Sequence, residues 1–421
     1  LVTDPELAAA GWADYYEDLA TPKQNTQWDA AFLAQAQDDL QVIEDRAAAV
    51  PSGSRITHDE VKRAIKNLNS GKAADLDGIK AENIKLAAET LTHTLAMLFT
   101  ELITHGAPRS MKTGKKLPIA KKGKNITYME NHRGITITSA LGKTYEHILK
   151  NRMGLLPQST LQFGFTEGLC PQMAALCLTE AISEAKIMKT PLVVATLDTQ
   201  KAFDVVSHPI LFRDLYNKGI ELDIWRAIKD MYEGLCERVY WQGNYSRNYQ
   251  ICQGVGQGKI LSPILYKTYA DNLLQTLEDS GLGMYIGTTY VGAPTCADDV
   301  LLISPADSMI QGMLDITYEY AGERRYSIHP TKSEATSRTG KDPALVLGDR
   351  TLSCTSAVTH LGLSRNLRGG SHTVQARIDC ARRAAYSLIP AGLHGENGLP
   401  PPASRKLITT YILPRLLYGL E

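Results

Sequence analysis

The stretch PTCADDVLLIS, residues 294–304, decides how the rest of the chain is interpreted. Two adjacent aspartates, Asp298 and Asp299, separate a short run that ends at Cys296 from an apolar, β-branched run. This pattern is typical of two strands joined by a turn. The Asp pair then has two interpretations. It can serve the backbone of the turn, or its carboxylates can be ligands for a hard cation such as Mg²⁺.

A second buried strand also ends in an aspartate. VVATLD, residues 193–198, is an apolar run that ends at Asp198. A lone Asp there is commonly a helix cap. If this strand and those around the Asp pair are neighbours in one sheet, three carboxylates converge. Such a set suits two Mg²⁺ ions a few ångströms apart, which can activate a hydroxyl and stabilise a leaving oxygen.

Length and composition limit the class of protein. With 421 residues, of which 43% are hydrophobic, the chain can form two or three lobes with substantial cores. Lys and Arg number 45, as do Asp and Glu, so any nucleic-acid binding must rest on local patches. The seven cysteines lack a CxxC spacing, which favours free thiols in a reducing compartment. We expect no membrane span and no signal peptide.

Helical and strand patterns alternate irregularly, which predicts an α+β fold. Two short runs, LPIA and GITIT, favour a pair of strands around a lysine-rich loop. Thr57 and Glu60 have the spacing of a capping box at the start of a helix. A hairpin and a glycine-rich bend are expected over 238–258. Helical patterns are expected at 1–50, 80–106, 139–152, 208–220, 223–235, 262–281, 306–325, 371–390 and 402–421.

The glycine-rich bend GVGQGK, residues 254–259, is not a phosphate loop of the Walker type. That pattern requires a glycine where Gln253 stands and Ser or Thr where Ile260 stands. The bend therefore needs another explanation, which comes from its place between the two aspartate-bearing strands.

Three motifs resemble those of reverse transcriptases, in the same order: TLDTQKAFDVV, QGVGQGKILSPILY and TCADDVLLIS. Upstream, SGKAADLDGI, LPIAKKGKN, NHRGITITSALGKTYEHIL and LQFGFTEG resemble fingers motifs of the non-LTR (LINE-type) retrotransposon enzymes. Downstream, SIHPTKSE and VTHLGL resemble the motif after the Asp pair and the primer-grip turn. The resemblance covers roughly residues 57–421.

The resemblance implies roles for the matching residues. Asp198, Asp298 and Asp299 correspond to the catalytic aspartates that bind metal, and Phe203 to the ring that excludes a ribose 2′-OH. Asp204, at the end of the first motif, is expected to be structural. The remaining implied roles are dNTP binding by Lys121, Arg133, Gln257 and Gly258, general acid catalysis by Lys332, and the primer grip at Leu361 and Gly362.

Several positions depart from the usual motifs. This chain has DLDGI where the family usually has GxDGI, and HRGI where it usually has YRPI. Thr166 replaces a usual arginine, and His329 replaces a usual asparagine. These departures concern the grip on nucleic acid. Cys296 stands where an aromatic residue usually precedes the Asp pair, and it is interpreted as a small packing residue. The three metal-binding aspartates are all present.

The fold that the resemblance implies is a right-hand polymerase with fingers, palm and a partial thumb. We expect a helical extension over 1–56, fingers with the first palm elements over 57–190, the catalytic palm over 191–365 and a truncated thumb over 366–421. Because the chain starts at Leu1 and stops inside an apolar periodic pattern, it is interpreted as a fragment of a longer polypeptide.

The implied function is RNA-directed DNA synthesis from an RNA template, a DNA primer and dNTPs, with two Mg²⁺ ions or Mn²⁺ in their place. The parent polyprotein is expected to carry an endonuclease and to work inside the cell, in nucleus or cytoplasm. Two alternatives stay open: an intron-type or other cellular reverse transcriptase, and an inactive remnant of a retroelement.

Overall fold

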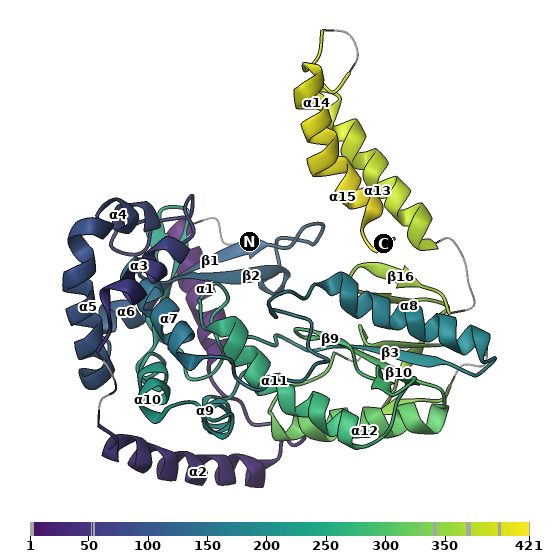
Figure 1. Cartoon of the computed structure of the whole chain (residues 1–421), viewed down its shortest axis with the longest axis horizontal. Coiled ribbons are helices and arrows are strands. Elements are labelled where there is room, and N and C mark those ends of the chain that lie inside the picture. The colour runs from purple at the N-terminus through teal and green to yellow at the C-terminus, as the bar shows by residue number, and fades with distance from the viewer. Residues whose placement is uncertain are drawn as a thin grey trace. The chain divides into compact units, whose positions relative to one another are not determined.

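A computed structural model describes residues 4–51, 53, 55–329, 331–339, 343–367, 372–394 and 397–420 (Figure 1). The chain forms two compact units, each assembled from separate segments. The first comprises residues 1–158, 200–272 and 320–327, and the second residues 159–199, 273–319 and 328–421. Among the described residues no helix is both long enough and apolar enough to cross a bilayer.

The first unit combines many helices with one sheet. Its sheet has the strand order β2-β1-β4-β5, with β6 also paired to β4. LPIA and GITIT lie in the two predicted strands, β1 and β2, which pair antiparallel, whereas β1 and β4 are parallel. The elements are α1 (Pro5–Ala20), α2 (Ala30–Ala49), α3 (His58–Asn67), α4 (Ala81–Leu86), α5 (Ala88–His105), α6 (Arg109–Lys112), β1 (Thr113–Ala120), η1 (Met129–Asn131), β2 (His132–Ile137), α7 (Ala140–Met153), α9 (His208–Asn217), α10 (Leu222–Asp230), β4 (Cys236–Trp241), β5 (Asn244–Tyr245) and β6 (Tyr249–Gln250).

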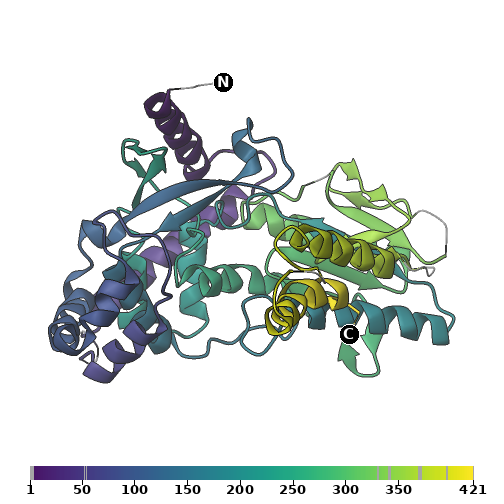
Figure 2. The same ribbon diagram turned by 90° about the horizontal axis from the view of Figure 1, so that it is seen from above.

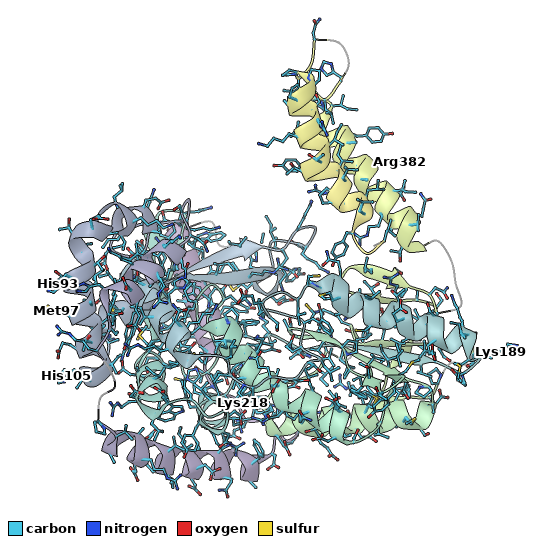
Figure 3. All side chains as sticks on the ribbon, viewed as in Figure 1. His93, Met97, His105, Lys189, Lys218 and Arg382 are labelled. Carbon is cyan, nitrogen blue, oxygen red and sulfur yellow. The ribbon has the colours of Figure 1, made fainter. Side chains whose placement is uncertain are left out.

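The core of this unit lies between amphipathic helices. α5 buries Phe99 and Leu102, while His93, Met97 and His105 lie on its outer side (Figure 3). The largest fully buried side chain is Trp225 of α10, whose indole N–H donates to the carbonyl of Phe212 at 2.8 Å. Trp225 therefore buries its ring in the core while its one polar atom stays hydrogen-bonded.

α3 begins with the predicted capping box. Thr57 accepts from the backbone N–H of Glu60, and the Glu60 carboxylate accepts from the backbone N–H of Thr57 at 2.8 Å. The same carboxylate receives two hydrogen bonds from Arg152 of α7, at 2.7 and 3.1 Å. The capping box therefore also ties α3 to α7.

This pair predicts acid sensitivity. Hydrogen bonds from Arg152 lower the pKa of Glu60 from 4.5 to about 2. The stabilisation is complete above pH 4.5 and is lost as the pH falls through about 2. We expect Glu60→Gln to remove on the order of 2 kcal/mol of unfolding free energy at pH 7 and progressively less below pH 4. Urea unfolding at several pH values measures this. An equal loss at pH 7 and pH 2.5 would contradict it.

The second unit is built around a five-stranded sheet with the order β14-β11-β3-β10-β9. β3 lies between two antiparallel neighbours, β10 and β11. Its elements are α8 (Pro171–Ile187), β3 (Val193–Asp198), β7 (Tyr285–Ile286), β8 (Thr289–Tyr290), β9 (Thr295–Cys296), β10 (Asp299–Ser304), β11 (Glu334–Ser337), β12 (Val346–Leu347), β13 (Arg350–Thr351), β14 (Ser353–Cys354), β15 (Val358–His360), β16 (Leu363–Arg365), α13 (His372–Leu388), α14 (Pro401–Leu407), a π-helical turn (Ile408–Ile412) and α15 (Leu413–Leu417).

Helices cover the two faces of this sheet. α8 packs Leu178 and Ala181 against the alternate residues Val194, Leu301 and Ile303 of β3 and β10. α12 (Asp307–Glu323) lies on the opposite face (Figure 1). With both faces covered, the central strands are continuous apolar runs, as VVATL and VLLIS predicted. α12 and α11 (Ser262–Asp279) each continue from one unit into the other.

Near the C-terminal end, helices form an antiparallel pair. α13 and the run from α14 to α15 lie side by side in both views (Figures 1 and 2). The predicted single helix over 402–421 instead contains a π-helical turn before Pro414, because proline removes a backbone donor. The helix predicted over 80–106 is likewise interrupted, at Ala87. The fingers, palm and thumb boundaries stay a prediction.

Candidate active site

Two of the three aspartates lie directly opposite each other in the second unit. In the antiparallel pair of β3 and β10, Asp299 is in register with Asp198. The condition on which the sequence argument rested, that Asp198 and the Asp pair lie on neighbouring strands of one sheet, is therefore met. One detail was wrong, because Asp299 is the first residue of β10 and not a turn residue. The neighbour of β3 is β10, the strand that follows the Asp pair.

A two-residue loop carries the third aspartate. Ala297 and Asp298 join β9 to β10, and Cys296 pairs with Asp299 across the loop. Ala297 has φ of 61°, and Asp298 is not among the positive-φ residues. A positive φ at the first loop position alone is the pattern of a type II′ turn, where glycine is usual. An alanine there is strained by about 1–3 kcal/mol, so surrounding contacts must hold the turn.

The three carboxylates repel one another. Partial burial, then Asp298 and then Asp198, raise the pKa of Asp299 to about 6. Burial and the charge of Asp198 also raise the pKa of Asp298. Both shifts thus reflect partly buried carboxylates and, in addition, negative charge concentrated in one place. A cation bound among the carboxylates would remove the repulsion.

Lys332 supplies part of that compensation. Its Nζ lies 2.9 Å from Oδ2 of Asp198. The side chains of Lys332 and Asp198 are 60% and 36% exposed, so the ion pair adds little stability. The chain around Lys332 is held to β3, since the backbone N–H of His329 donates to the carbonyl of Asp198 at 2.7 Å. The lysine is therefore placed at the aspartate by the fold.

Cys296 is unsuited to nucleophilic chemistry. Burial and the charges of Asp299 and Asp298 raise the pKa of its thiol to about 11. A thiol with such a pKa stays protonated at neutral pH and is a poor nucleophile. The interpretation of Cys296 as a packing residue agrees with this chemistry.

The donor set suits a hard divalent cation. Within the described ranges, no group of three or more His, Cys, Asp or Glu side chains forms a ready-made metal cage. Mg²⁺ does not need one, because it is usually held by one or two carboxylates together with substrate phosphates. Carboxylate oxygens at adjoining strand ends, with pKa values raised by burial and by the neighbouring carboxylates, fit that mode of binding.

The two candidate triphosphate-binding cations lie at the β1–β2 hairpin of the first unit. Arg133 is exposed on β2, in register with Ile119 of β1. Lys121 follows β1 directly, and its Nζ donates to the carbonyl of Glu130 at 2.9 Å. Both cations therefore belong to the base of one lysine-rich loop, as their motif predicted.

Phe203 lies against an aromatic partner in the same unit. Its ring stacks on Tyr266 of α11, with ring centroids 4.6 Å apart and planes at 14°. Tyr266 is buried and Phe203 is half-buried. The stack fixes the ring while leaving part of it accessible. Asp204, the next residue, is close to Lys116 and Lys201, in keeping with a structural role.

Gln257 and Gly258 form a bend docked on β2. The backbone N–H of Thr136 donates to the carbonyl of Gln257 at 2.8 Å. Gly258 has φ of +105°, and a Cβ added there would lie 2.8 Å from the carbonyl oxygen of Thr136. A side chain at 258 is therefore excluded on both counts, and the bend keeps its backbone close to the strand.

Two buried glutamates that sequence reasoning missed hold this bend and its strand. Glu146 of α7 accepts from the backbone N–H groups of Ile260 and Leu261 at 2.7 and 3.2 Å, at the start of α11. Glu237 of β4 forms an ion pair with Lys116 at 3.0 Å and accepts a hydrogen bond from the hydroxyl of Thr136 at 2.7 Å. In the sequence, each of these glutamates is a charged residue among apolar ones, and this pattern could have indicated a buried carboxylate.

The Glu237–Lys116 pair predicts a measurable coupling. Both side chains are buried, at 1% and 5% exposure. We expect Glu237→Leu to cost about 3–5 kcal/mol of unfolding free energy, because the buried Lys116 loses the carboxylate that it contacts directly and keeps only the more distant charge of Asp204. The double variant Glu237→Leu/Lys116→Met should cost less than Glu237→Leu alone. Urea unfolding of the double-mutant cycle measures this, and additive losses would contradict the coupling.

The candidate primer grip is the turn of the β15–β16 hairpin. Leu361 and Gly362 have φ of 52° and 74°, the pattern of a type I′ turn. Residues from the C-terminal helices contact its backbone. Tyr418 donates to the carbonyl of Leu361 at 2.9 Å, and Arg377 of α13 donates to that of Gly362.

Comparison with known proteins shows the family of this chain. A family model described as reverse transcriptase (RNA-dependent DNA polymerase) matches residues 119–363. The RNA-directed DNA polymerase from mobile element jockey of Drosophila melanogaster is 27% identical over 388 residues, covering 87% of this chain and 41% of the relative. The Pol polyprotein from the type-1 retrotransposable element R2 of Popillia japonica is 26% identical over 386 residues, covering 87% and 51%.

The strand-end aspartates in a mixed α+β scaffold define a polymerase of the right-hand class. The chain belongs to the reverse transcriptase family, and its similarity to the jockey and R2 proteins confirms the LINE-type resemblance. It spans about half or less of the length of these curated relatives. Reverse transcriptases generally use divalent metal ions, which agrees with the donor set described above.

Proposed function

We propose that this chain is the RNA-directed DNA polymerase portion of a retrotransposon polyprotein. The observation that carries the proposal is the register of β3 and β10, which sets Asp299 opposite Asp198 with Asp298 in the adjoining turn. The names of the jockey and BS relatives, both RNA-directed DNA polymerases of mobile elements, support it. The polyproteins from R2 favour a longer parent protein, for which we propose an additional endonuclease.

Asp198, Asp298 and Asp299 would hold two Mg²⁺ ions, or Mn²⁺ in their place. When bound, the ions activate the primer 3′-hydroxyl and stabilise the leaving pyrophosphate. The protein keeps the carboxylates on rigid strand ends. Lys332 would exchange its ion pair with Asp198 for the pyrophosphate and donate a proton to the leaving oxygen, as the general acid.

Groups of the first unit would select and hold the nucleotide. Arg133 can bind phosphate oxygens through two N–H donors, and Lys121 adds a point charge. The ring of Phe203, fixed against Tyr266, would exclude a 2′-hydroxyl by steric contact. Gln257 and Gly258 would present a backbone surface, free of side chain at 258, to the nascent base pair.

The template and primer would be held mainly through their phosphates. Arg382 and Arg383 are exposed on α13, and Figure 3 shows Arg382 on that helix. Such contacts do not depend on base sequence and weaken as salt increases. The primer 3′ end would lie at the turn of Leu361 and Gly362.

Primer extension tests the proposal. The purified chain is incubated with an RNA template, an annealed DNA primer, dNTPs and Mg²⁺. We expect extension that stops when EDTA is added. The same assay on a DNA template shows whether the synthesis prefers an RNA template. A folded chain without incorporation under any of these conditions would favour the inactive remnant.

A further inference from the structure

The catalytic turn is bordered by a short segment that the proposed mechanism does not use. Residues 161–164, from the LQFG part of a motif assigned by resemblance to the fingers, lie in the second unit beside β9. The backbone N–H of Phe163 donates to the carbonyl of Thr295 at 2.8 Å. The N–H of Thr295 donates to the carbonyl of Leu161 at 2.9 Å. The segment therefore extends the sheet next to the turn.

One side chain of this segment binds both backbone groups of the strained turn residue. Oε1 of Gln162 accepts from the N–H of Ala297 at 2.8 Å, and Nε2 donates to the carbonyl of Ala297 at 3.4 Å. The same Oε1 accepts from the N–H of Gly164 at 2.8 Å. Gln162 is 2% exposed, so water cannot readily replace these bonds.

The geometry of the turn explains why it needs such a partner. In a two-residue hairpin the inter-strand bonds join the flanking residues, here Cys296 and Asp299. The first loop residue, Ala297, is left with a positive φ and with backbone groups outside the strand ladder. Gln162 satisfies both groups, so it offsets the strain and fixes the direction in which Asp298 leaves the turn.

Close packing adds a second restraint. A Cβ added to Gly164 would lie 2.3 Å from the backbone nitrogen of Ala297. The segment and the turn are therefore in direct backbone contact, and any side chain at 164 would push the turn away. Gly164 has no positive φ, so this contact, rather than backbone conformation, requires glycine here.

We propose that Gln162 is a positioning residue for catalysis, which clamps the Ala297–Asp298 turn so that the Asp298 carboxylate stays beside Asp198 and Asp299. Gly164 allows the close approach that the clamp needs. This inference rests on the proposed function for its kinetic consequence, whereas the clamp itself can be tested without any activity.

The principal variant is Gln162→Met, which preserves length and removes all three hydrogen bonds. We expect kcat for primer extension to fall about 10–100-fold, because a turn that has lost its buried hydrogen bonds no longer holds Asp298 in a fixed place. The KM for dNTP and the Kd for primer–template should change less than twofold, since Gln162 positions only the turn. Gln275→Met, on an exposed residue of α11, is the matched control and should behave as wild type.

Amide hydrogen exchange tests the clamp directly. The peptide that contains Ala297 should exchange faster in Gln162→Met. Gln162→Glu keeps both acceptor bonds but places a second acceptor against the carbonyl of Ala297, so it should retain part of the protection, more than Gln162→Met. Gly164→Ala should lower kcat with Gln162 intact. Thermal unfolding identifies any variant that fails to fold. If Gln162→Met does not fold, the kcat values and the exchange rates of the Ala297 peptide are compared between Gln162→Glu and Gly164→Ala.

The outcomes separate the two proposals. Unchanged kcat and unchanged exchange near Ala297 in folded Gln162→Met would overturn the clamp. Faster exchange near Ala297 with unchanged kcat would overturn its role in catalysis. If the wild-type chain extends no primer, the proposed function fails, and the exchange of the Ala297 peptide still decides whether Gln162 clamps the turn.

Discussion

Asp298→Asn is expected to abolish primer extension, with kcat lowered by about 10³-fold or more. Removing one charged ligand from a metal-assisted reaction costs several kcal/mol of transition-state stabilisation. Asparagine keeps the size of the side chain and its fit in the two-residue turn, so the structural effect should be small. Steady-state primer extension on an RNA template, with Mg²⁺ and then Mn²⁺, measures the loss.

The same variant should be at least as stable as the wild type without metal. Burial and then the charge of Asp298 raise the pKa of Asp299, so the Asp298 carboxylate disfavours ionisation of its neighbour. Removing one charge relieves that repulsion, so the melting temperature should stay the same or rise. Asp315→Asn, on an exposed carboxylate of α12, removes an equal charge and should leave activity intact. Lost stability together with lost activity would instead indicate a structural role for Asp298.

Local patterns predicted the strands that carry the site. The apolar runs that end at Asp198 and follow Asp299 are continuous, as in strands buried on both faces, and this property needs no knowledge of their neighbours. The capping box at Thr57 was predictable for the same reason, since its hydrogen bonds join residues three positions apart. Features set by sequence neighbours were therefore accessible from the sequence.

Features set by distant neighbours were not. Which strand flanking the Asp pair would join β3 depends on the register of the whole sheet. Glu146 reaches a bend more than a hundred residues further along the chain, and Gln162 reaches Ala297 across a similar separation. A polar residue inside an apolar segment signals a buried partner, but it does not identify that partner.

The turn at Ala297 depends both on residues that are neighbours in the sequence and on distant residues. The tight turn was predicted, but its conformation places an alanine where glycine is usual. A strained backbone persists when the surrounding structure determines it. Here Gln162 supplies the hydrogen bonds, and Gly164 supplies the space. The position of the Asp298 carboxylate is thus a product of tertiary contacts, which agrees with a site whose chemistry needs fixed geometry.

Phe203→Ala is expected to relax the choice of sugar. The ring is held flat against Tyr266 and is half-buried, so a part of it can contact the sugar of a bound nucleotide. Removing the ring opens space for a 2′-hydroxyl. Discrimination against ribonucleotides, measured as the ratio of kcat/KM for dNTP and rNTP, should fall about 10–200-fold, since a steric contact of this size is worth roughly 1–3 kcal/mol.

Phe203→Tyr is the control, because it keeps the ring in the stack and should retain the discrimination of the wild type. Tyr266→Leu removes the stacking partner and leaves the Phe203 ring in place. We expect it to lower stability more than selectivity, since Tyr266 is the more deeply buried ring. If Phe203→Ala keeps the wild-type ratio while remaining folded and active with dNTPs, Phe203 is a packing residue and the selection of sugar lies elsewhere. If Tyr266→Leu alone relaxes the ratio, the stack rather than the ring itself provides the barrier.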